Sequence, residues 1–379
     1  MSVPLDLVYV AIAGLAFGLG LVCVPLAQRF GQRFGFVDAV NPAKIHDEPK
    51  VRCGGVGIFA AFMGAFAICL LAAGLLKDSP LVPESLRAHL GNISFVKDKL
   101  GGLMLGATIL FLTGLADDRF NLRPTVKLFL QILSALPLVL SGITVKFFVP
   151  GMLAGAVMTI AWVVLLTNAF NFLDNMDGLS SGVAIVAALN FFLISRGGDE
   201  YFMMAIIALF IGAVAGFWRY NFPRARLFMG DSGSLFIGYM LAGISTLVTY
   251  YKAGVPTQAP VIAPLIVLGV PIFDTVSVLL IRWKNGAPLM KGDQNHFSHR
   301  LVALGFSRVR TVLFIYLVTF AVGITAVNLR YLGWAGASLA LVQVILFFVI
   351  IHQIERAAQQ KQLMALAALS REREHGETD

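Results

Sequence analysis

Residues 151–182 read GMLAGAVMTIAWVVLLTNAFNFLDNMDGLSSG, and this stretch organises the interpretation of the whole chain. It begins with an apolar run that, with its flank, is long enough to cross a bilayer. Polar residues then follow in two pairs with a spacing of three, namely Asn168 and Asn171, then Asp174 and Asp177. In a continuing helix this spacing stacks each pair on one face. Gly178 then permits a positive φ. Such polar groups at a membrane-helix end are costly unless a metal, a ligand or water meets them, although a solvated polar turn is the simpler alternative.

The composition predicts an integral membrane protein. Apolar residues make up 58% of the chain and charged residues 13%, whereas soluble proteins carry roughly 25% charged residues. A net charge of +8 would suggest a nucleic-acid partner in a soluble chain. Here the excess of Lys and Arg on cytoplasmic loops and contact with anionic lipid explain it better, so no nucleic-acid partner is expected. Three scattered cysteines form neither a disulfide framework nor a metal-binding spacing.

Eleven apolar runs are long enough to span a membrane. They are approximately Leu7–Ala27, Gly57–Leu76, Leu100–Leu115, Val126–Ser141, Gly151–Phe172, Ser180–Ser195, Tyr201–Phe217, Ser232–Tyr250, Gln258–Ile281, Thr311–Leu329 and Trp334–Ile354. The third and fourth runs are short enough to be tilted or broken. Because none of the runs alternates polar and apolar residues as a barrel strand does, the expected fold is an all-α polytopic bundle. We expect residues 1–354 to form the transmembrane domain and residues 355–379 a charged cytoplasmic tail.

The distribution of basic residues predicts the orientation. The loops after the odd-numbered runs, with the C-terminal tail, carry 20 Lys and Arg residues, against eight in the N-terminus and the remaining loops. The first set is therefore assigned to the cytoplasm and the N-terminus to the outside. Only the loop from Lys77 to Lys99 departs from this pattern, and it is long and also acidic.

On this map the polar clusters all fall on the cytoplasmic side, which predicts one composite active site at that membrane interface. The clusters contain His46; Asp117 and Asp118; Asp174 and Asp177; Asn221, Phe228 and Asp231; and His296, His299 and Arg300. Two adjacent carboxylates such as Asp117 and Asp118 point in different directions from a helix, so they need not share one task.

The number of acids predicts a divalent cation. Two like charges at ~4 Å repel by about 4 kcal/mol at an effective dielectric constant of 20, and a bound cation would offset this repulsion. Oxygen ligands without cysteine favour Mg²⁺, with Mn²⁺ as an alternative, and Asp231 is the candidate ligand, although a helix N-cap is its simpler role. Because Mg²⁺ completes its coordination with water and phosphate oxygens, the substrate should be phosphorylated. His296 and His299 have the spacing of a zinc pair, but no convincing further ligands accompany them.

Five motifs in order, GLADDR, NAFNFLDNMDGL, FMGDSGS, FDT and DQNHFSHRL, resemble those of the polyprenyl-phosphate N-acetylhexosamine-1-phosphate transferase family, or glycosyltransferase family 4. The resemblance covers residues 44–305. It implies an enzyme of the inner (plasma) membrane that moves a sugar-1-phosphate from a UDP-sugar onto a polyprenyl phosphate such as undecaprenyl phosphate. The enzyme would release UMP, require Mg²⁺ and catalyse the first membrane step of cell-envelope glycan synthesis.

The same resemblance implies roles for individual residues. Asp117 and Asp118 correspond to the catalytic acidic pair near the attacking lipid phosphate, Asp231 to the Mg²⁺ ligand, and Phe228 to an aromatic residue that stacks on uracil. The remaining residues expected to bind substrate are His46, Asn168, Asn171, Asp174, Asp177, Asn221, His296, His299 and Arg300.

Two residues depart from the family pattern. Asn175 stands where many members have glycine, and Ser298 stands where the usual histidine motif has its middle histidine. Asp274 lies inside the ninth run. We expect it near the cytoplasmic end as a helix break or a partner between helices, with an active-site role as the alternative.

The expected donor is UDP-N-acetylglucosamine or a close N-acetylhexosamine relative. Residues 292–300 lack the run of histidines followed by Phe-Glu that is typical of MraY-type phospho-MurNAc-pentapeptide transferases. That type remains the alternative enzyme. A cation-coupled transporter is the alternative from another class, and it predicts carboxylates near the middle of spans together with inverted repeats. A homodimer is compatible with the sequence.

Overall fold

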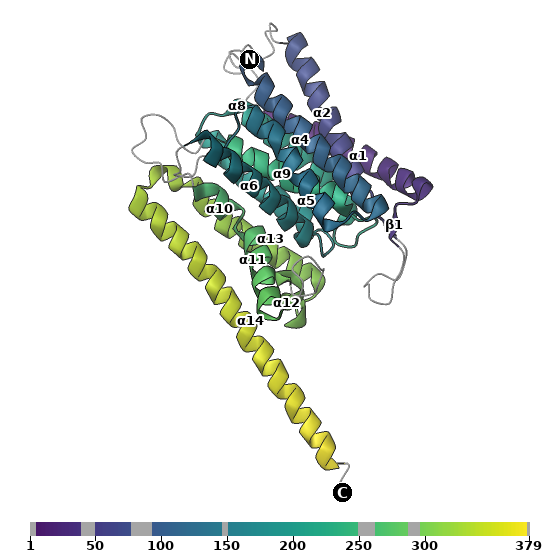
Figure 1. Ribbon diagram of the computed structural model, residues 1–379, viewed down its shortest axis with the longest axis vertical. Coiled ribbons are helices and arrows are strands. Elements are labelled where there is room, and N and C mark those ends of the chain that lie inside the picture. The colour runs from purple at the N-terminus through teal and green to yellow at the C-terminus, as the bar shows by residue number, and fades with distance from the viewer. Residues whose placement is uncertain are drawn as a thin grey trace.

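The computed structural model describes residues 5–38, 50–76, 93–145, 151–248, 262–286 and 296–376. These residues are mainly helical, and the expectation of an all-α membrane bundle is confirmed (Figure 1). A two-residue antiparallel ladder joins β1 (Val37–Asp38) to β2 (Lys50–Val51), and a short 3₁₀ turn covers Leu329–Tyr331. The helices are α1 (Leu5–Phe34), α2 (Gly54–Leu76), α4 (Ile93–Phe120), α5 (Pro124–Leu140), α6 (Met152–Leu173), α7 (Leu179–Gly197), α8 (Tyr201–Asn221), α9 (Gly230–Leu247), α10 (Ala263–Val267), α11 (Gly269–Lys284), α12 (Phe297–Ala303), α13 (Arg308–Val327) and α14 (Trp334–Gly376).

Eight helices in the described ranges are long and apolar enough to cross a membrane, namely α1, α2, α4, α6, α7, α8, α13 and α14. The third predicted run lies in α4, a continuous helix of 28 residues. The other three predicted runs correspond to the 17-residue α5, to α9 with Asp231 in its first turn, and to α10 and α11, which are separated at Leu268. The chain is thus a multi-pass membrane protein, and the count of eleven spans stays a prediction.

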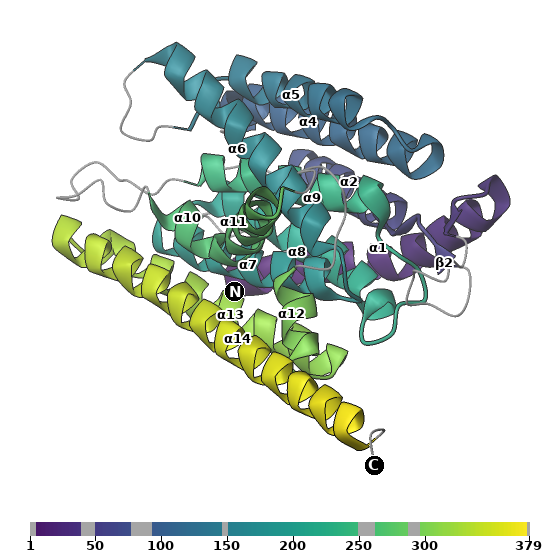
Figure 2. The ribbon, with the colours of Figure 1, turned by 60° about the horizontal axis from the view of Figure 1, so that its bottom comes forward.

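Helix α9 is the centre of the bundle. It packs against α2, α4, α6, α7 and α8, and almost all of its residues are buried. In Figure 2, α4 and α5 lie at one side of this centre and α14 lies at the other. The first turn of α9 carries Asp231, so the most enclosed helix of the fold begins at a predicted site residue.

The ends of the helices determine where the predicted site residues lie. α4, α6 and α8 end, and α5, α7, α9 and α12 begin, at or near the polar motifs. The helical structure is interrupted between α10 and α11 at Leu268, six residues before Asp274. Asp274 therefore lies within the continuous helix α11 and not at the interruption. This position differs from one of the two roles expected for Asp274, that of a helix break.

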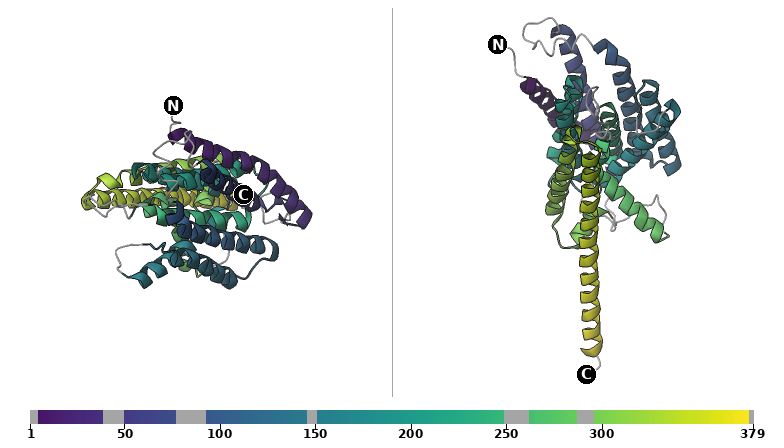
Figure 3. Two further views of the ribbon diagram at one scale, coloured as in Figure 1. Left: turned by 90° about the horizontal axis from the view of Figure 1, so that it is seen from above. Right: turned by 90° about the vertical axis from the view of Figure 1, so that its left-hand side faces the viewer.

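Helix α14 is 43 residues long, or roughly 65 Å at 1.5 Å per residue. This is about twice the thickness of a bilayer hydrocarbon core. The helix therefore continues well beyond the bundle, as Figures 1 and 3 show, and the predicted tail from residue 355 to residue 376 is helical. The N- and C-termini lie at opposite ends of the molecule.

Candidate active site

A lysine joins two of the predicted acids. Lys127, in the first turns of α5, donates to Asp117 Oδ2 at 2.9 Å and also contacts Asp231 Oδ2. Asp117 Oδ1 accepts the Leu122 N–H at 2.7 Å. The Asp231 side chain is 28% exposed, so this carboxylate is only partly buried. The ammonium group places a positive charge between two carboxylates from α4 and α9.

The neighbouring Asp118 contacts the backbone of α9. Its Oδ1 accepts the N–H of Asp231 at 2.8 Å and its Oδ2 accepts the N–H of Ser232 at 3.0 Å. These are unpaired donors of a helix N-terminus, where a negative charge is also favourable. Gly230 has a φ of +72°, and an added Cβ would lie 2.6 Å from Asp118 Oδ2. Glycine at this position therefore allows the close approach. Asp117 and Asp118 have separate contacts, as their different directions on a helix led us to expect.

The two asparagines of α6 have different surroundings. Asn171 Nδ2 donates to Asp231 Oδ1 at 3.0 Å and to Ser234 Oγ at 2.9 Å, so it orients the candidate metal ligand. Asn168 instead forms a reciprocal amide pair with Gln131 of α5, with distances of 2.8 and 3.3 Å. Asn171 thus belongs to the acidic cluster, whereas Asn168 joins α6 to α5.

The turn after α6 is held by the segment between α8 and α9. Asp177 Oδ2 accepts the Ala225 N–H at 2.9 Å. Asn221, which is buried, accepts the Gly178 N–H through Oδ1 at 2.7 Å and donates to the Leu227 carbonyl at 3.0 Å. Gly178 has a φ of +76°, which confirms the expected positive φ. Asp177 and Asn221 therefore hold two loops together, and their predicted contact with substrate stays a prediction.

Asp174 lies at the end of α6, outside the helix that crosses the membrane. Burial, and after it the negative charge of Asp231, raises the pKa of Asp174 to about 8, although Arg52 acts in the opposite direction. A carboxyl group that resists ionisation in this way gains from a nearby cation. The field of the acidic cluster therefore reaches the turn that carries Asp174.

Phe228 lies beside β2 and the start of α2. Its N–H donates to the Val51 carbonyl at 2.8 Å, its carbonyl accepts the Gly54 N–H at 2.9 Å, and the Lys50 ammonium lies 5.2 Å from the ring centroid. The half-buried ring is therefore held on a backbone frame near a basic side chain. His46, expected to bind substrate, lies outside the described residues.

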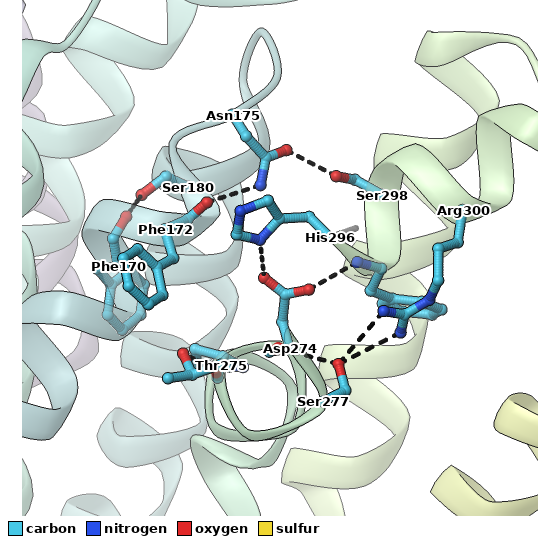
Figure 4. Close-up of polar contacts among 12 residues, drawn as sticks. Phe170, Phe172, Asn175, Ser180, Asp274, Thr275, Ser277, His296, Ser298 and Arg300 are labelled. Carbon is cyan, nitrogen blue, oxygen red and sulfur yellow. Dashed lines mark hydrogen bonds and ion pairs between the residues drawn. The ribbon is translucent and has the colours of Figure 1, made fainter. Parts of the chain in front are cut away.

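The histidine motif lies at the start of α12. His296 Nδ1 is 2.8 Å from Asp274 Oδ2, and the Phe297 N–H donates to Asp274 Oδ1 at 2.6 Å (Figure 4). Asp274 thus joins α11 to the start of α12, which is one of the two roles expected for it from the sequence. The two residues that depart from the family pattern contact each other, since the Ser298 hydroxyl donates to Asn175 Oδ1 at 2.6 Å. The His299 ring centroid lies 6.4 Å from that of His296.

Arg300 has contacts with α14 and α11. Its Nε lies 3.1 Å from both carboxylate oxygens of Glu355, and its terminal nitrogens lie 3.3 and 3.4 Å from Ser277 Oγ. Arg300 is 7% exposed and Glu355 is 2% exposed. Much of this guanidinium is directed to a buried partner, and its predicted contact with a diphosphate stays a prediction.

The donor set near Asp231 fits a magnesium ion. The carboxylates of Asp117 and Asp231 share one cationic group in Lys127, which shows that this position stabilises positive charge. Asn171 and Ser234 add hard polar groups beside Asp231. Among the residues that the structure describes, no group of three or more His, Cys, Asp or Glu could enclose a metal. A site with one or two carboxylates suits Mg²⁺, which retains water and binds substrate phosphates.

Lys127 lies within the fourth predicted run and was not among the predicted site residues. A lysine inside an apolar run is itself a signal, because a charged group at that depth requires a partner. Gln131, one helical turn later, is buried and pairs with Asn168. The spacing of Lys127 and Gln131 on one face of a helix could have indicated that α5 contacts the site.

Comparison with known proteins identifies relatives over most of the chain. The family model for glycosyl transferase family 4 matches residues 100–249. A Bacillus subtilis protein named "Probable undecaprenyl-phosphate N-acetylglucosaminyl 1-phosphate transferase" is 31% identical over 319 residues, which cover 82% of each chain. A decaprenyl-phosphate N-acetylglucosaminephosphotransferase of Mycolicibacterium smegmatis is 32% identical and covers 75% of this chain and 73% of the relative. A phospho-N-acetylmuramoyl-pentapeptide-transferase of Desulforudis audaxviator is 30% identical and covers 86% of this chain and 96% of the relative.

Proposed function

Because the chain belongs to glycosyl transferase family 4, we propose that it transfers N-acetylglucosamine-1-phosphate from UDP-N-acetylglucosamine to undecaprenyl phosphate or a related polyprenyl phosphate. The products are a lipid diphosphate-linked sugar and UMP. The observation that carries the proposal is the cluster of Asp117, Lys127, Asn171 and Asp231 at the ends of membrane helices. A phosphate at the membrane surface and a water-soluble nucleotide meet at such a position.

The reaction is a phosphoryl transfer. An oxygen of the lipid phosphate attacks the β-phosphorus of the UDP-sugar, the bond from that phosphorus to the bridging oxygen breaks, and the bridging oxygen leaves with the electron pair as part of UMP. Asp117 Oδ2 positions the attacking phosphate and accepts its proton when the phosphate arrives protonated. The Lys127 ammonium, at 2.9 Å from that oxygen, offsets the negative charge that gathers there.

Mg²⁺ would neutralise oxygens of the diphosphate and act as a Lewis acid. Asp231 is the residue that would hold it. Asn171 orients the Asp231 side chain, and Asp118 fixes the backbone from which that side chain projects. Asp118 is therefore a positioning residue in this mechanism, whereas Asp117 contacts the reacting group. This division refines the sequence expectation, which assigned catalysis to the pair.

The proposed location is the inner (plasma) membrane, with the site and the C-terminal part of α14, from residue 355 onward, on the cytoplasmic side and the N-terminus outside. The basic residues of the sequence favour this orientation. Opposite ends for the two termini agree with it.

Two alternatives remain open to experiment. A phospho-MurNAc-pentapeptide transferase is supported by the similarity to the Desulforudis audaxviator protein, although residues 292–300 lack the typical histidine run. A cation-coupled transporter requires acids near mid-span. Asp117, Asp174 and Asp231 lie at helix ends, which favours an enzyme at the membrane surface.

The test uses the purified full chain with undecaprenyl phosphate, Mg²⁺ and a panel of UDP-sugars, with UMP release as the readout. We expect turnover with UDP-N-acetylglucosamine, loss of turnover on removal of Mg²⁺, and faster product formation than from UDP-MurNAc-pentapeptide in competition. Asp231→Ala should lose both turnover and metal-dependent nucleotide binding. A folded Asp231→Ala variant within a few-fold of wild-type turnover would refute the metal assignment, and no UMP from any UDP-sugar would refute the function.

A further inference from the structure

Asp274 is a buried carboxylate to which the proposed mechanism gives no part. It lies in α11 and is 1% exposed. Both of its oxygens are engaged by the start of α12, Oδ1 by the Phe297 N–H at 2.6 Å and Oδ2 by His296 Nδ1 at 2.8 Å (Figure 4). Burial of a carboxylate is costly unless it is paired and hydrogen-bonded, and these two contacts meet that need.

The contact with Asp274 determines the protonation of the imidazole. An ionised carboxylate only accepts hydrogen bonds, so His296 Nδ1 must carry the proton. In the neutral ring the second nitrogen, Nε2, then presents a lone pair and acts as an acceptor. The Phe297 N–H supplies the other Asp274 oxygen with a donor, so the carboxylate is held in the orientation that faces the ring.

The imidazole is packed against the motif turn after α6. Its ring lies edge-on to that of Phe172 at 6.0 Å, and the Arg282 guanidinium lies 5.5 Å from the Phe172 ring. On the adjacent residue, Ser298 donates to Asn175 of the same turn at 2.6 Å. In Figure 4 the ring nitrogen that does not face Asp274 lies on the side of Phe172 and Asn175. Nε2 is thus directed to the turn that carries Asp174 and Asp177.

We propose that Asp274 is a positioning residue that holds His296 as the Nδ1–H tautomer, so that Nε2 accepts a hydrogen bond from a hydroxyl or N–H group of the UDP-sugar. This inference rests on the proposed function and deepens it. In this arrangement His296 accepts a hydrogen bond from an uncharged donor group of the substrate. Without Asp274 the ring could equally carry its proton on Nε2 and donate to a phosphate oxygen. Asp274 itself does not contact the substrate.

The test is a double-mutant cycle on the full chain in detergent, read as the equilibrium Kd for UDP-N-acetylglucosamine without lipid. Asp274→Asn keeps an oxygen for the Phe297 N–H, but its amide group donates to His296 Nδ1 and moves the ring proton to Nε2. We expect Asp274→Asn and His296→Ala each to raise Kd about tenfold, the effect of losing one good hydrogen bond. The double variant should bind no more weakly than His296→Ala alone.

Ser277→Ala is the matched control, because Ser277 lies one turn from Asp274 and contacts Arg300 of α12 without contacting His296. It should change Kd less than twofold. Wild-type affinity in Asp274→Asn, or additive losses in the double variant, would overturn the inference, as would an equal loss in Ser277→Ala.

A second variant covers the case in which Asp274→Asn does not fold. His296→Asn retains an amide N–H that can reach Asp274 but has no atom at the Nε2 position. It should keep the wild-type melting temperature and bind the donor as weakly as His296→Ala, and wild-type affinity would refute the inference. UMP release by the wild-type chain is measured in parallel, since its absence counts against the proposed function, whereas the binding cycle decides the role of Asp274.

Discussion

Replacement of Asp117 and Asp118, one at a time, should separate catalysis from stability within two adjacent residues. Asp118 accepts two backbone N–H groups at the start of α9, at 2.8 and 3.0 Å. Asp118→Asn keeps one acceptor oxygen and places an NH₂ group against the other backbone donor. Asp117→Asn keeps the oxygen that accepts the Leu122 N–H and loses the charge that faces Lys127.

The expected magnitudes follow from these contacts. A donor left without a partner costs about 1–3 kcal/mol, and loss of a negative charge at a helix N-terminus costs about 0.3–1 kcal/mol more. Asp118→Asn should therefore destabilise the fold by about 2–3 kcal/mol. Asp117→Asn should cost about 1 kcal/mol or less, because Lys127 retains Asp231 as a partner. Loss of a general base should instead lower its kcat by about 10²–10⁴.

The assay combines thermal unfolding in detergent with steady-state UMP release at saturating Mg²⁺. Asp118→Asn should melt several degrees below wild type, and Asp117→Asn should melt near wild type with kcat reduced far more than KM is raised. Asp118→Ala, which removes both acceptors, should melt lower than Asp118→Asn. Equal melting temperatures for all variants, or near-normal kcat in Asp117→Asn, would refute the division of roles.

Three further predictions concern other parts of the site. Lys127→Met leaves Asp117 and Asp231 without their shared cation, so Mg²⁺ should raise its melting temperature more than that of wild type; an equal or smaller rise contradicts this. Because the pKa of Asp174 is raised to about 8 in the folded state, the folded state retains a proton that the unfolded state loses near pH 4, and metal-free stability should fall as pH rises from 5 to 8. Asp174→Asn should flatten this pH dependence of the melting temperature, and an unchanged slope would rule out the assignment. A cysteine introduced near Ser370 should resist an impermeant thiol reagent added outside intact cells, and labelling there would reverse the orientation.

The sequence was sufficient for the fold class because a bilayer leaves few solutions for long apolar runs. It also predicted the positive φ of Gly178 and the separate directions of Asp117 and Asp118, which follow from backbone and helix geometry alone. These are local properties. Each can be read from residues within one turn of each other, so no knowledge of tertiary packing is needed.

The contacts that hold the site together were less accessible to sequence reasoning. Asp274 and His296 are 22 residues apart, and Arg300 and Glu355 are 55 apart. Nothing in the local pattern distinguishes an arginine that faces a diphosphate from one that faces a buried glutamate. Such pairings depend on which helices become neighbours, and packing decides this.

The turn that follows α6 shows why motif residues need not all contact substrate. Asp177 fixes the segment before α9, Asn175 accepts a hydrogen bond from α12, and Gly178 is held by Asn221. Asp174, in the same turn, lies in the field of Asp231. A shift of any of the three attached elements therefore moves Asp174 relative to the acidic cluster. Loss of activity on substitution of Asp177 or Asn221 consequently does not identify a ligand for the nucleotide. A melting temperature measured with the turnover separates the two roles, since a residue that holds the turn affects both and a ligand affects turnover alone.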